Sequence, residues 1–161
     1  LDSGAHFYDV YETADGKYIS IGSIEPQFYA LLKEKAGLDA DFDEQLNPAQ
    51  WPRQKEKIAA IFRSKSRDQW CQIMQGSDVC FAPVLGLEEA PQHPHNVARG
   101  SFIDVDGVTQ HAPTPRFSRT PSDTPQAMRK PGTDTRATLL RSGFSAQQID
   151  QLIDSGAVAQ L

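Results

Sequence analysis

The proline-rich segment between residues 113 and 131 most constrains how this chain can fold. Prolines stand at Pro113, Pro115, Pro121, Pro125 and Pro131, with Ser and Thr between them. Proline lacks a backbone N–H and fixes φ, so helix interiors and central strands exclude it. The segment therefore predicts an extended connector laid over a surface. It divides the chain into a small domain over 1–112, the connector over 113–131 and a C-terminal part over 132–161.

Runs of aromatic and β-branched residues in the first part predict strands. Residues 6–12 and 17–23 flank Asp15-Gly16, a dipeptide typical of β-hairpins. A second hairpin is expected over 101–111, around Asp106-Gly107. The apolar run 79–85 predicts a buried strand, in which Pro83 marks an edge or a bulge.

Helical spacing of apolar residues predicts three helices between these strands. The first spans 25–36 and ends at Gly37, the second opens at Trp51-Pro52, and Ser66 caps the third. The acidic stretch 38–50 is expected to be a solvated loop.

The C-terminal part predicts a pair of helices. The first spans 133–142, and a capping box of Ser145 and Gln148 opens the second. We expect the apolar residues of this pair to present an unfilled face or to fold back on themselves; they are Leu139, Leu140, Ile149, Leu152 and Ile153. The fold class is α+β, with a small antiparallel sheet of hairpins packed with helices, then the connector and the helical pair.

Charge and composition exclude several functions. The net charge is −5 and the isoelectric point about 5.3, so the electrostatic attraction that drives nucleic-acid binding is absent. No apolar run approaches the length of a membrane span, and no signal peptide is recognisable. Cys71 and Cys80 do not form a disulfide framework, and both are expected to be small buried hydrophobes in a reducing compartment.

The segment Gly22–Tyr29 places one carboxylate, Glu25, directly before Pro26 at a predicted helix start. The helix dipole favours a negative charge there, and proline is pre-organised for the first helical position. The position suits a catalytic or orienting acid. It suits an ordinary capping residue equally well.

Several blocks together resemble the α-methylacyl-CoA racemases of the family III CoA-transferase superfamily. In chain order these blocks are residues 1–8, 11–18, 24–29, 68–73, 82–85 and 95–102. The block Ile24–Phe28 is typical of the racemase branch, and Ala98–Phe102 is shared more widely across the superfamily. The resemblance covers nearly the whole chain and corresponds to the C-terminal portion of such an enzyme.

The resemblance implies an isomerase that racemises 2-methylacyl-CoA thioesters through an enolate. The family's proton-transferring His and Asp would lie in a half that precedes Leu1, so the 161-residue chain alone is expected to be inactive. Glu25 matches the acid that orients the catalytic His, and Tyr8 and Ile24 are weaker candidates for lining the acyl channel. Core packing under the hairpin is an equally good interpretation of Tyr8 and Ile24.

The same resemblance implies partners and compartment. The acyl-CoA is the substrate, and no metal or other cofactor is expected. The family members form interlocked homodimers, and fatty acid metabolism in the cytoplasm is the expected setting. The C-terminal helices would pack on the family's large domain.

Two other functions remain open. The chain is alternatively part of a CoA-transferase that moves CoA between carboxylic acids, or a non-catalytic module that binds a partner through its C-terminal helices. His93 and His95 alternate as metal ligands do, but no third ligand is spaced nearby. Arg99 either contacts a phosphate of CoA or pairs with an acid, and the ion pair is the favoured interpretation. The basic residues of the connector are interpreted as a solvated stretch.

Overall fold

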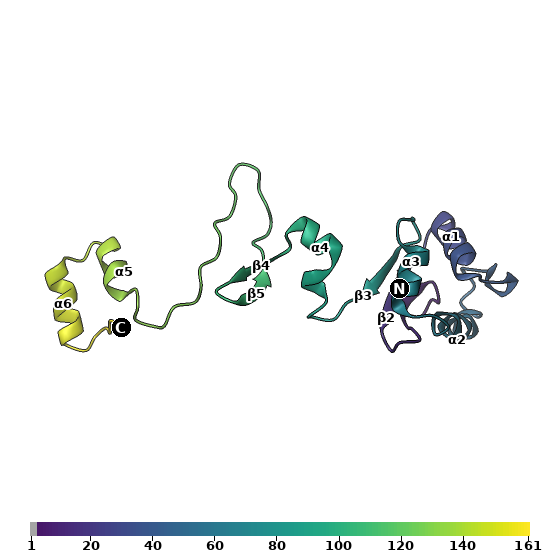
Figure 1. Cartoon of the computed structure of the whole chain (residues 1–161), viewed down its shortest axis with the longest axis horizontal. Coiled ribbons are helices and arrows are strands. Elements are labelled where there is room, and N and C mark those ends of the chain that lie inside the picture. Colours follow the sequence, from purple (N-terminus) through teal and green to yellow (C-terminus); the bar gives the residue numbers. More distant parts are fainter. Residues whose placement is uncertain (1–2) are drawn as a thin grey trace. The chain divides into compact units, whose positions relative to one another are not determined.

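The computed structural model describes residues 3–161, which form two compact units. The first unit ends at Ala90, and the second spans Pro91–Leu161 (Figure 1). The α+β class is confirmed, since each unit combines helices with a small antiparallel sheet. The hairpin predicted over 101–111 belongs to the second unit, whereas the sequence pattern placed it in the small domain over 1–112.

A three-stranded antiparallel sheet forms the centre of the first unit. Its strands are β1 (Tyr8–Glu12), β2 (Tyr18–Gly22) and β3 (Phe81–Val84), in the order β1-β2-β3. The turn of the expected hairpin reverses at Gly16, whose φ of 69° suits a residue without a Cβ.

Three helices bury the inner face of this sheet. They are α1 (Pro26–Ala36), α2 (Trp51–Phe62) and α3 (Arg67–Met74). The predicted helix start signals are confirmed: Pro lies in the first turn of α1 and α2, and a Ser66–Gln69 capping box begins α3. Gly37 ends α1 in the left-handed conformation.

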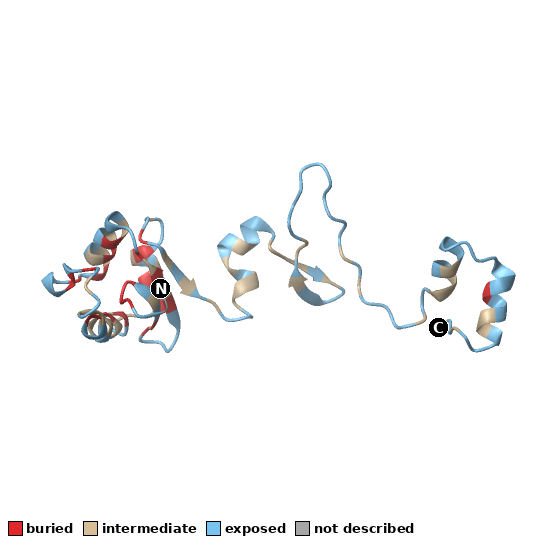
Figure 2. Ribbon diagram, turned by 180° about the vertical axis from the view of Figure 1, so that it is seen from behind, coloured by how far each residue is buried: buried red, intermediate tan, exposed pale blue. Residues whose placement is uncertain are grey.

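The buried residues of the described chain gather between this sheet and these helices (Figure 2). Three aromatic rings connect the layers, because Phe62 contacts Tyr11 at 5.3 Å and Trp70 at 5.1 Å between ring centroids. The largest fully buried apolar side chains are Trp70, Phe7, Phe42, Phe62, Ile19, Leu32, Ile58, Met74, Ile149 and Val79. All of them except Ile149 belong to the first unit.

The prediction of a solvated loop over 38–50 was wrong in part. A 3-10 turn, η1 (Ala40–Phe42), directs Phe42 into the core, and Leu38 and Gln45 are buried as well. The acidic residues around them stay exposed, so the loop has a polar outer surface while Leu38 and Phe42 are buried in the core. A single buried aromatic among acids has no periodicity, which is why the sequence pattern missed it.

The prediction that 79–85 is a buried strand was also wrong. Strand β3 lies at the sheet edge, and its residues alternate between half-buried and exposed positions. Pro83 stands in this edge strand, where a missing N–H is tolerated, so the edge expectation is confirmed. Cys80 is exposed and Cys71 is half-buried, so the expectation that both are buried hydrophobes does not hold.

The second unit begins with η2 (Ala90–Gln92) at its boundary and α4 (Pro94–Arg99). Strands β4 (Phe102–Val105) and β5 (Val108–His111) then form the expected hairpin. Asp106 and Gly107 both have positive φ, as a type I′ turn requires. The proline-rich segment that follows contains no helix or strand up to residue 134.

The C-terminal helices are α5 (Thr135–Arg141) and α6 (Ala146–Asp154), and the Ser145–Gln148 capping box is confirmed. The pair folds back on itself. Ile149 is fully buried, while Leu139, Leu152 and Ile153 are half-buried and Leu140 stays 49% exposed. A backbone hydrogen bond from the Leu161 N–H to the Gly132 carbonyl closes the turn around them.

Candidate active-site segment around Glu25

Glu25 is the residue immediately before α1, with an extended backbone and an exposed side chain. Its carbonyl accepts the N–H groups of Phe28 and Tyr29, which starts the helix. Its carboxylate makes no capping hydrogen bond, although the residue occupies the N-cap position. Side-chain capping therefore does not account for an acid at this position.

The backbone leading to Glu25 is fixed by buried polar side chains. The Gln45 side-chain amide donates to the carbonyls of Ser23 (3.0 Å) and Ile24 (2.8 Å). The Trp51 indole donates in turn to the Gln45 carbonyl at 2.8 Å, which joins the loop to α2. The Ser23 hydroxyl donates to the Val79 carbonyl at 2.5 Å. Glu25 thus projects from a rigid segment that is attached to three separate parts of the unit.

The sequence pattern did not identify these positioning residues. Gln45 lies in the stretch expected to be solvated, and a single Gln among polar residues has no distinguishing periodicity. Ser23 is a buried polar residue between a strand and a helix, where sequence gives no sign of its partner. Trp51 was predicted only as a helix start.

Tyr8 lies at the end of the outer sheet face, opposite Gly22 in the ladder. A Cβ built on Gly22 would lie 3.2 Å from Tyr8 Cε2, which is closer than ordinary van der Waals contact. Gly22 therefore lets the Tyr8 ring lie against the backbone just before Ser23. The ring is 41% exposed, so it is not a core residue under the hairpin.

A shallow groove of about 400 Å³ runs over this outer face. Its walls come from all three strands and are largely apolar; the residues include Tyr8, Val10, Ser20, Gly22, Cys80 and Ala82. Ile24 is 37% exposed but is not among the residues that line the groove. The structure thus places Tyr8 at this groove and does not bring Ile24 to it.

Glu25 acts electrostatically on one end of the groove. Burial raises the pKa of the Cys80 thiol, and the negative charges of Glu25 and Asp78 raise it further. A thiol with a raised pKa stays protonated at neutral pH and is a weak nucleophile. Cys80 is therefore a neutral wall residue, and the charged residue that lines the groove is Asp9, which pairs with Lys55.

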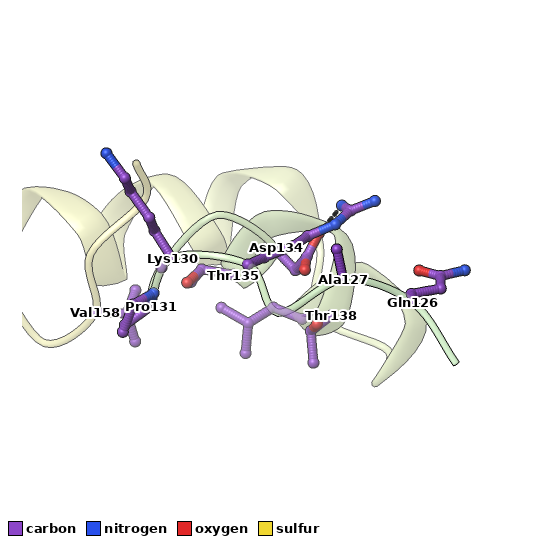
Figure 3. Close-up of a pocket in the computed structure, with 11 residues that line it drawn as sticks. Gln126, Ala127, Lys130, Pro131, Asp134, Thr135, Thr138 and Val158 are labelled. Atoms are coloured by element: carbon purple, nitrogen blue, oxygen red, sulfur yellow. Dashed lines mark hydrogen bonds and ion pairs between the residues drawn. The ribbon is translucent and has the colours of Figure 1, made fainter. Parts of the chain in front are cut away.

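A cavity of about 570 Å³ lies elsewhere, in the second unit (Figure 3). It is bounded by the end of the connector and by α5. Arg129 donates to Asp134 at 2.6 Å across its rim, so these two charges neutralise each other. Figure 3 shows the Lys130 side chain extending away from Thr138. None of the predicted site residues lines this cavity.

The described part of the chain holds neither a metal-binding cluster nor a helix that could span a membrane. His93 precedes α4 and His95 lies in its first turn, and residues 3–161 contain no cluster of three or more His, Cys, Asp or Glu that suits a metal ion. No helix among the described residues is long and apolar enough to cross a bilayer.

The sequence profile of CoA-transferase family III matches residues 1–135. Since this is most of the chain, the protein belongs to that family. The chain is also 46% identical over 156 residues to α-methylacyl-CoA racemase from Mus musculus and 43% identical to the racemase from Homo sapiens. Each match covers 94% of this chain but 41% of the relative, so the chain spans less than half the length of these proteins.

More distant similarity extends to transferases and to solved structures. The L-carnitine CoA-transferase of Proteus mirabilis is 33% identical over 84 residues, which is 49% of this chain and 21% of that protein. A crystal structure of Rv3272 from Mycobacterium tuberculosis superposes with a TM-score of 0.61 at 16% identity. It covers 78% of this chain and 37% of that one. That structural match establishes the fold alone.

Proposed function

We propose that this chain is part of an α-methylacyl-CoA racemase, which inverts the configuration of 2-methylacyl-CoA thioesters. The observation that carries the proposal is the 43–46% identity to two proteins of that name over 94% of the chain. Racemisation removes the proton from the α-carbon and returns one to the opposite face. The C–H electron pair passes into the thioester as an enolate, so nothing is oxidised or reduced.

The reaction needs two acid–base groups on opposite sides of the α-carbon. We assign these to a His and an Asp in the part of the racemases that this chain does not cover. Acid–base chemistry of this kind requires no metal or redox cofactor. The 161-residue chain alone is accordingly expected to be inactive.

Glu25 is the positioning residue in this proposal. A carboxylate that accepts one ring N–H of a histidine fixes its tautomer and stabilises the imidazolium. Three observations support the role: the carboxylate is exposed, it makes no capping hydrogen bond, and its backbone is held by Ser23 and Gln45. Tyr8 would contribute the wall nearest the acyl group, and Ile24 a further contact beside Glu25.

The quaternary and cellular setting belongs to the same proposal. An interlocked homodimer would bring the Glu25 segment to the rest of the active site, and α5 and α6 would pack on the large domain. Cytoplasmic fatty acid metabolism is the setting we propose for the substrate.

The test is deuterium wash-in at the α-carbon of a 2-methylacyl-CoA in D2O. A longer chain that includes the upstream half is compared with its Glu25→Gln variant and with the 161-residue chain. Glu34→Gln is the matched control, because Glu34 is an exposed acid of the same helix. We expect exchange in the long chain and in Glu34→Gln, exchange slowed by about 100-fold in Glu25→Gln, and none in the short chain.

A second function has its own support, since the family match and the L-carnitine CoA-transferase similarity both fit a transferase. Such an enzyme forms a covalent intermediate on a carboxylate nucleophile. No exchange by the long chain, with CoA transfer to a free acid instead, would contradict the racemase proposal. Absence of both activities would favour a non-catalytic binding module.

A further inference from the structure

A polar pocket lies in the second unit, where α4 passes into the β4–β5 hairpin. It measures about 410 Å³ and is lined by Arg99, Ser101, His111, Ala112, Thr114 and Arg116. These residues come from the end of α4, the edges of the hairpin and the start of the connector. The β4–β5 hairpin brings residues 99–101 and 111–116 together around one hollow.

The hairpin base gives this pocket a defined shape. The Ala112 N–H donates to the Ser101 carbonyl at 3.0 Å, which extends the β4–β5 ladder by one bond. The His111 ring stacks on Phe102 with 4.7 Å between ring centroids. The imidazole is thereby held at the edge of the hairpin.

Arg116 fastens the connector to the end of α4. Its guanidinium donates to the carbonyls of Arg99 (2.5 Å) and Gly100 (2.6 Å). These are carbonyls that a helix end leaves unpaired, and a cation is favoured beside them. Two of its N–H groups are used in this way, which fixes the guanidinium at the pocket wall and leaves further N–H groups for another acceptor.

The pocket has positively charged lining residues and no acidic ones. Arg99, Arg116 and His111 line it together with the hydroxyls of Ser101 and Thr114, and no carboxylate is among its lining residues. The Arg99 guanidinium makes no hydrogen bond or ion pair within residues 3–161. The expectation that Arg99 pairs with an acid is therefore not met in the described chain. By contrast, Arg129 in the larger cavity is already neutralised by Asp134.

We propose that this pocket binds a phosphate group. Guanidinium groups match phosphate oxygens in pairs of parallel hydrogen bonds, and Ser and Thr hydroxyls supply further donors. A pocket rich in hydrogen-bond donors, with no carboxylate among its lining residues to repel an anion, fits that chemistry. Arg99 is the principal ligand, with Arg116, Ser101 and Thr114 around it.

The phosphate has two possible sources, a phosphate group of CoA or a free anion such as pyrophosphate. Only the CoA source rests on the proposed function. A phosphate of CoA bound here would add a contact remote from the reacting carbon, and such remote contacts supply binding energy for positioning.

The test is titration of the 161-residue chain with sodium pyrophosphate, CoA and dephospho-CoA at constant ionic strength, followed by amide chemical shifts in NMR spectra. We expect saturable shifts at Ser101, Ala112 and Thr114 for at least pyrophosphate. Arg99→Gln should weaken binding by about tenfold, as expected for loss of one charge-assisted hydrogen-bond pair. Arg119→Gln is the matched control, because Arg119 is an exposed arginine of the connector that lines none of the described pockets.

Each outcome decides the proposal. Tighter binding of CoA than of dephospho-CoA or pyrophosphate, weakened in Arg99→Gln, supports the pocket and assigns it to the CoA 3′-phosphate. Equal binding of pyrophosphate and CoA, also weakened in Arg99→Gln, supports the pocket with a free anion. Equal weakening by Arg99→Gln and Arg119→Gln, or no saturable shift at these amides, overturns it. None of these readouts uses racemase activity, so the pocket and the proposed function can fail separately.

Discussion

His6 is the most consequential buried polar residue of the described chain. Its ring is fully buried among Phe7, Tyr29 and Phe42. The Tyr29 hydroxyl donates to the Phe42 carbonyl at 2.8 Å, so the 2.7 Å contact between His6 Nε2 and that hydroxyl requires a proton on Nε2. Nδ1 is then a bare acceptor, and it has no partner. His6 is therefore neutral and supports the fold as an Nε2–H donor.

This arrangement predicts acid sensitivity. Burial lowers the pKa of His6 from 6.5 to about 4. Because the folded-state pKa lies below the unfolded value, His6 contributes full stability above pH 6.5, and that contribution is lost as the pH falls toward 4. We expect the loss to approach about 3 kcal/mol in the free energy of unfolding, measured by urea denaturation from pH 7 to pH 4.

The variant His6→Gln tests the origin of this dependence. It should be less stable at pH 7, and its stability should fall less steeply between pH 6.5 and pH 4. His95→Gln serves as the control because His95 is exposed. A slope that His6→Gln leaves unchanged would assign the acid sensitivity to other groups.

Gln45 offers a second prediction for a single residue. Gln45→Ala removes both hydrogen bonds to the carbonyls of Ser23 and Ile24 and leaves these groups without their donor. We expect a loss of about 2 kcal/mol in the free energy of unfolding, measured by urea denaturation. In the long chain, kcat should fall while KM changes little, because Glu25 loses its fixed direction. The exposed Gln72→Ala should alter neither, and an unchanged kcat in Gln45→Ala would separate Gln45 from the positioning of Glu25.

At the scale of elements, predictions succeeded wherever local chemistry decides the conformation. Asp-Gly turns, helix-opening prolines, capping boxes and a C-terminal glycine each act through neighbouring backbone groups, and the structure contains all of them. The 38–50 loop and strand β3 were mispredicted because their burial depends on distant partners. Phe42 is buried against a histidine ring from another segment, and β3 has a second edge to which no strand among residues 3–161 pairs.

The candidate site divides in the same way. Glu25 at a helix start was identified from sequence, because its neighbours Ile24 and Pro26 form a local pattern. Gln45 and Ser23 were not, since their roles arise only when segments 22 and 56 residues apart in sequence meet. The groove likewise needs three strands, of which the last follows after α3.

Gly22 gives a prediction about the junction between β2 and α1. Gly22→Ala keeps an allowed backbone, but its Cβ would lie 3.2 Å from the Tyr8 ring. We expect the ring to move away from the groove wall, with a loss of about 1 kcal/mol in stability. A crystal structure of the variant would show the ring displaced, and Tyr8→Ala in the same background should restore the stability lost. If Tyr8→Ala did not restore stability in the Gly22→Ala background, the close contact between Tyr8 and Gly22 would not determine the stability of the junction.

At the scale of the whole molecule, hydrophobic burial is unevenly distributed. Figure 2 shows the buried residues concentrated in the first unit. Among the described residues of the second unit, Ile149 of α6 is the one buried position. Stability against local opening follows buried apolar contact, and exposed hydrogen bonds open most easily. The central β2 strand carries Ile19 and Ile21, which are both buried, whereas β5 contains no buried residue.

This asymmetry predicts two levels of hydrogen-exchange protection. Amides of β1 and β2 should exchange far more slowly than those of β4 and β5, although both sheets form complete antiparallel ladders. Ile58→Ala, which creates a cavity under the first sheet, should cost about 3 kcal/mol and accelerate exchange in β1 and β2. Leu87→Ala should leave these amides unchanged, because Leu87 is 95% exposed. Equal protection of the two hairpins in the wild-type chain would mean that the second unit is stabilised by something other than its own buried side chains.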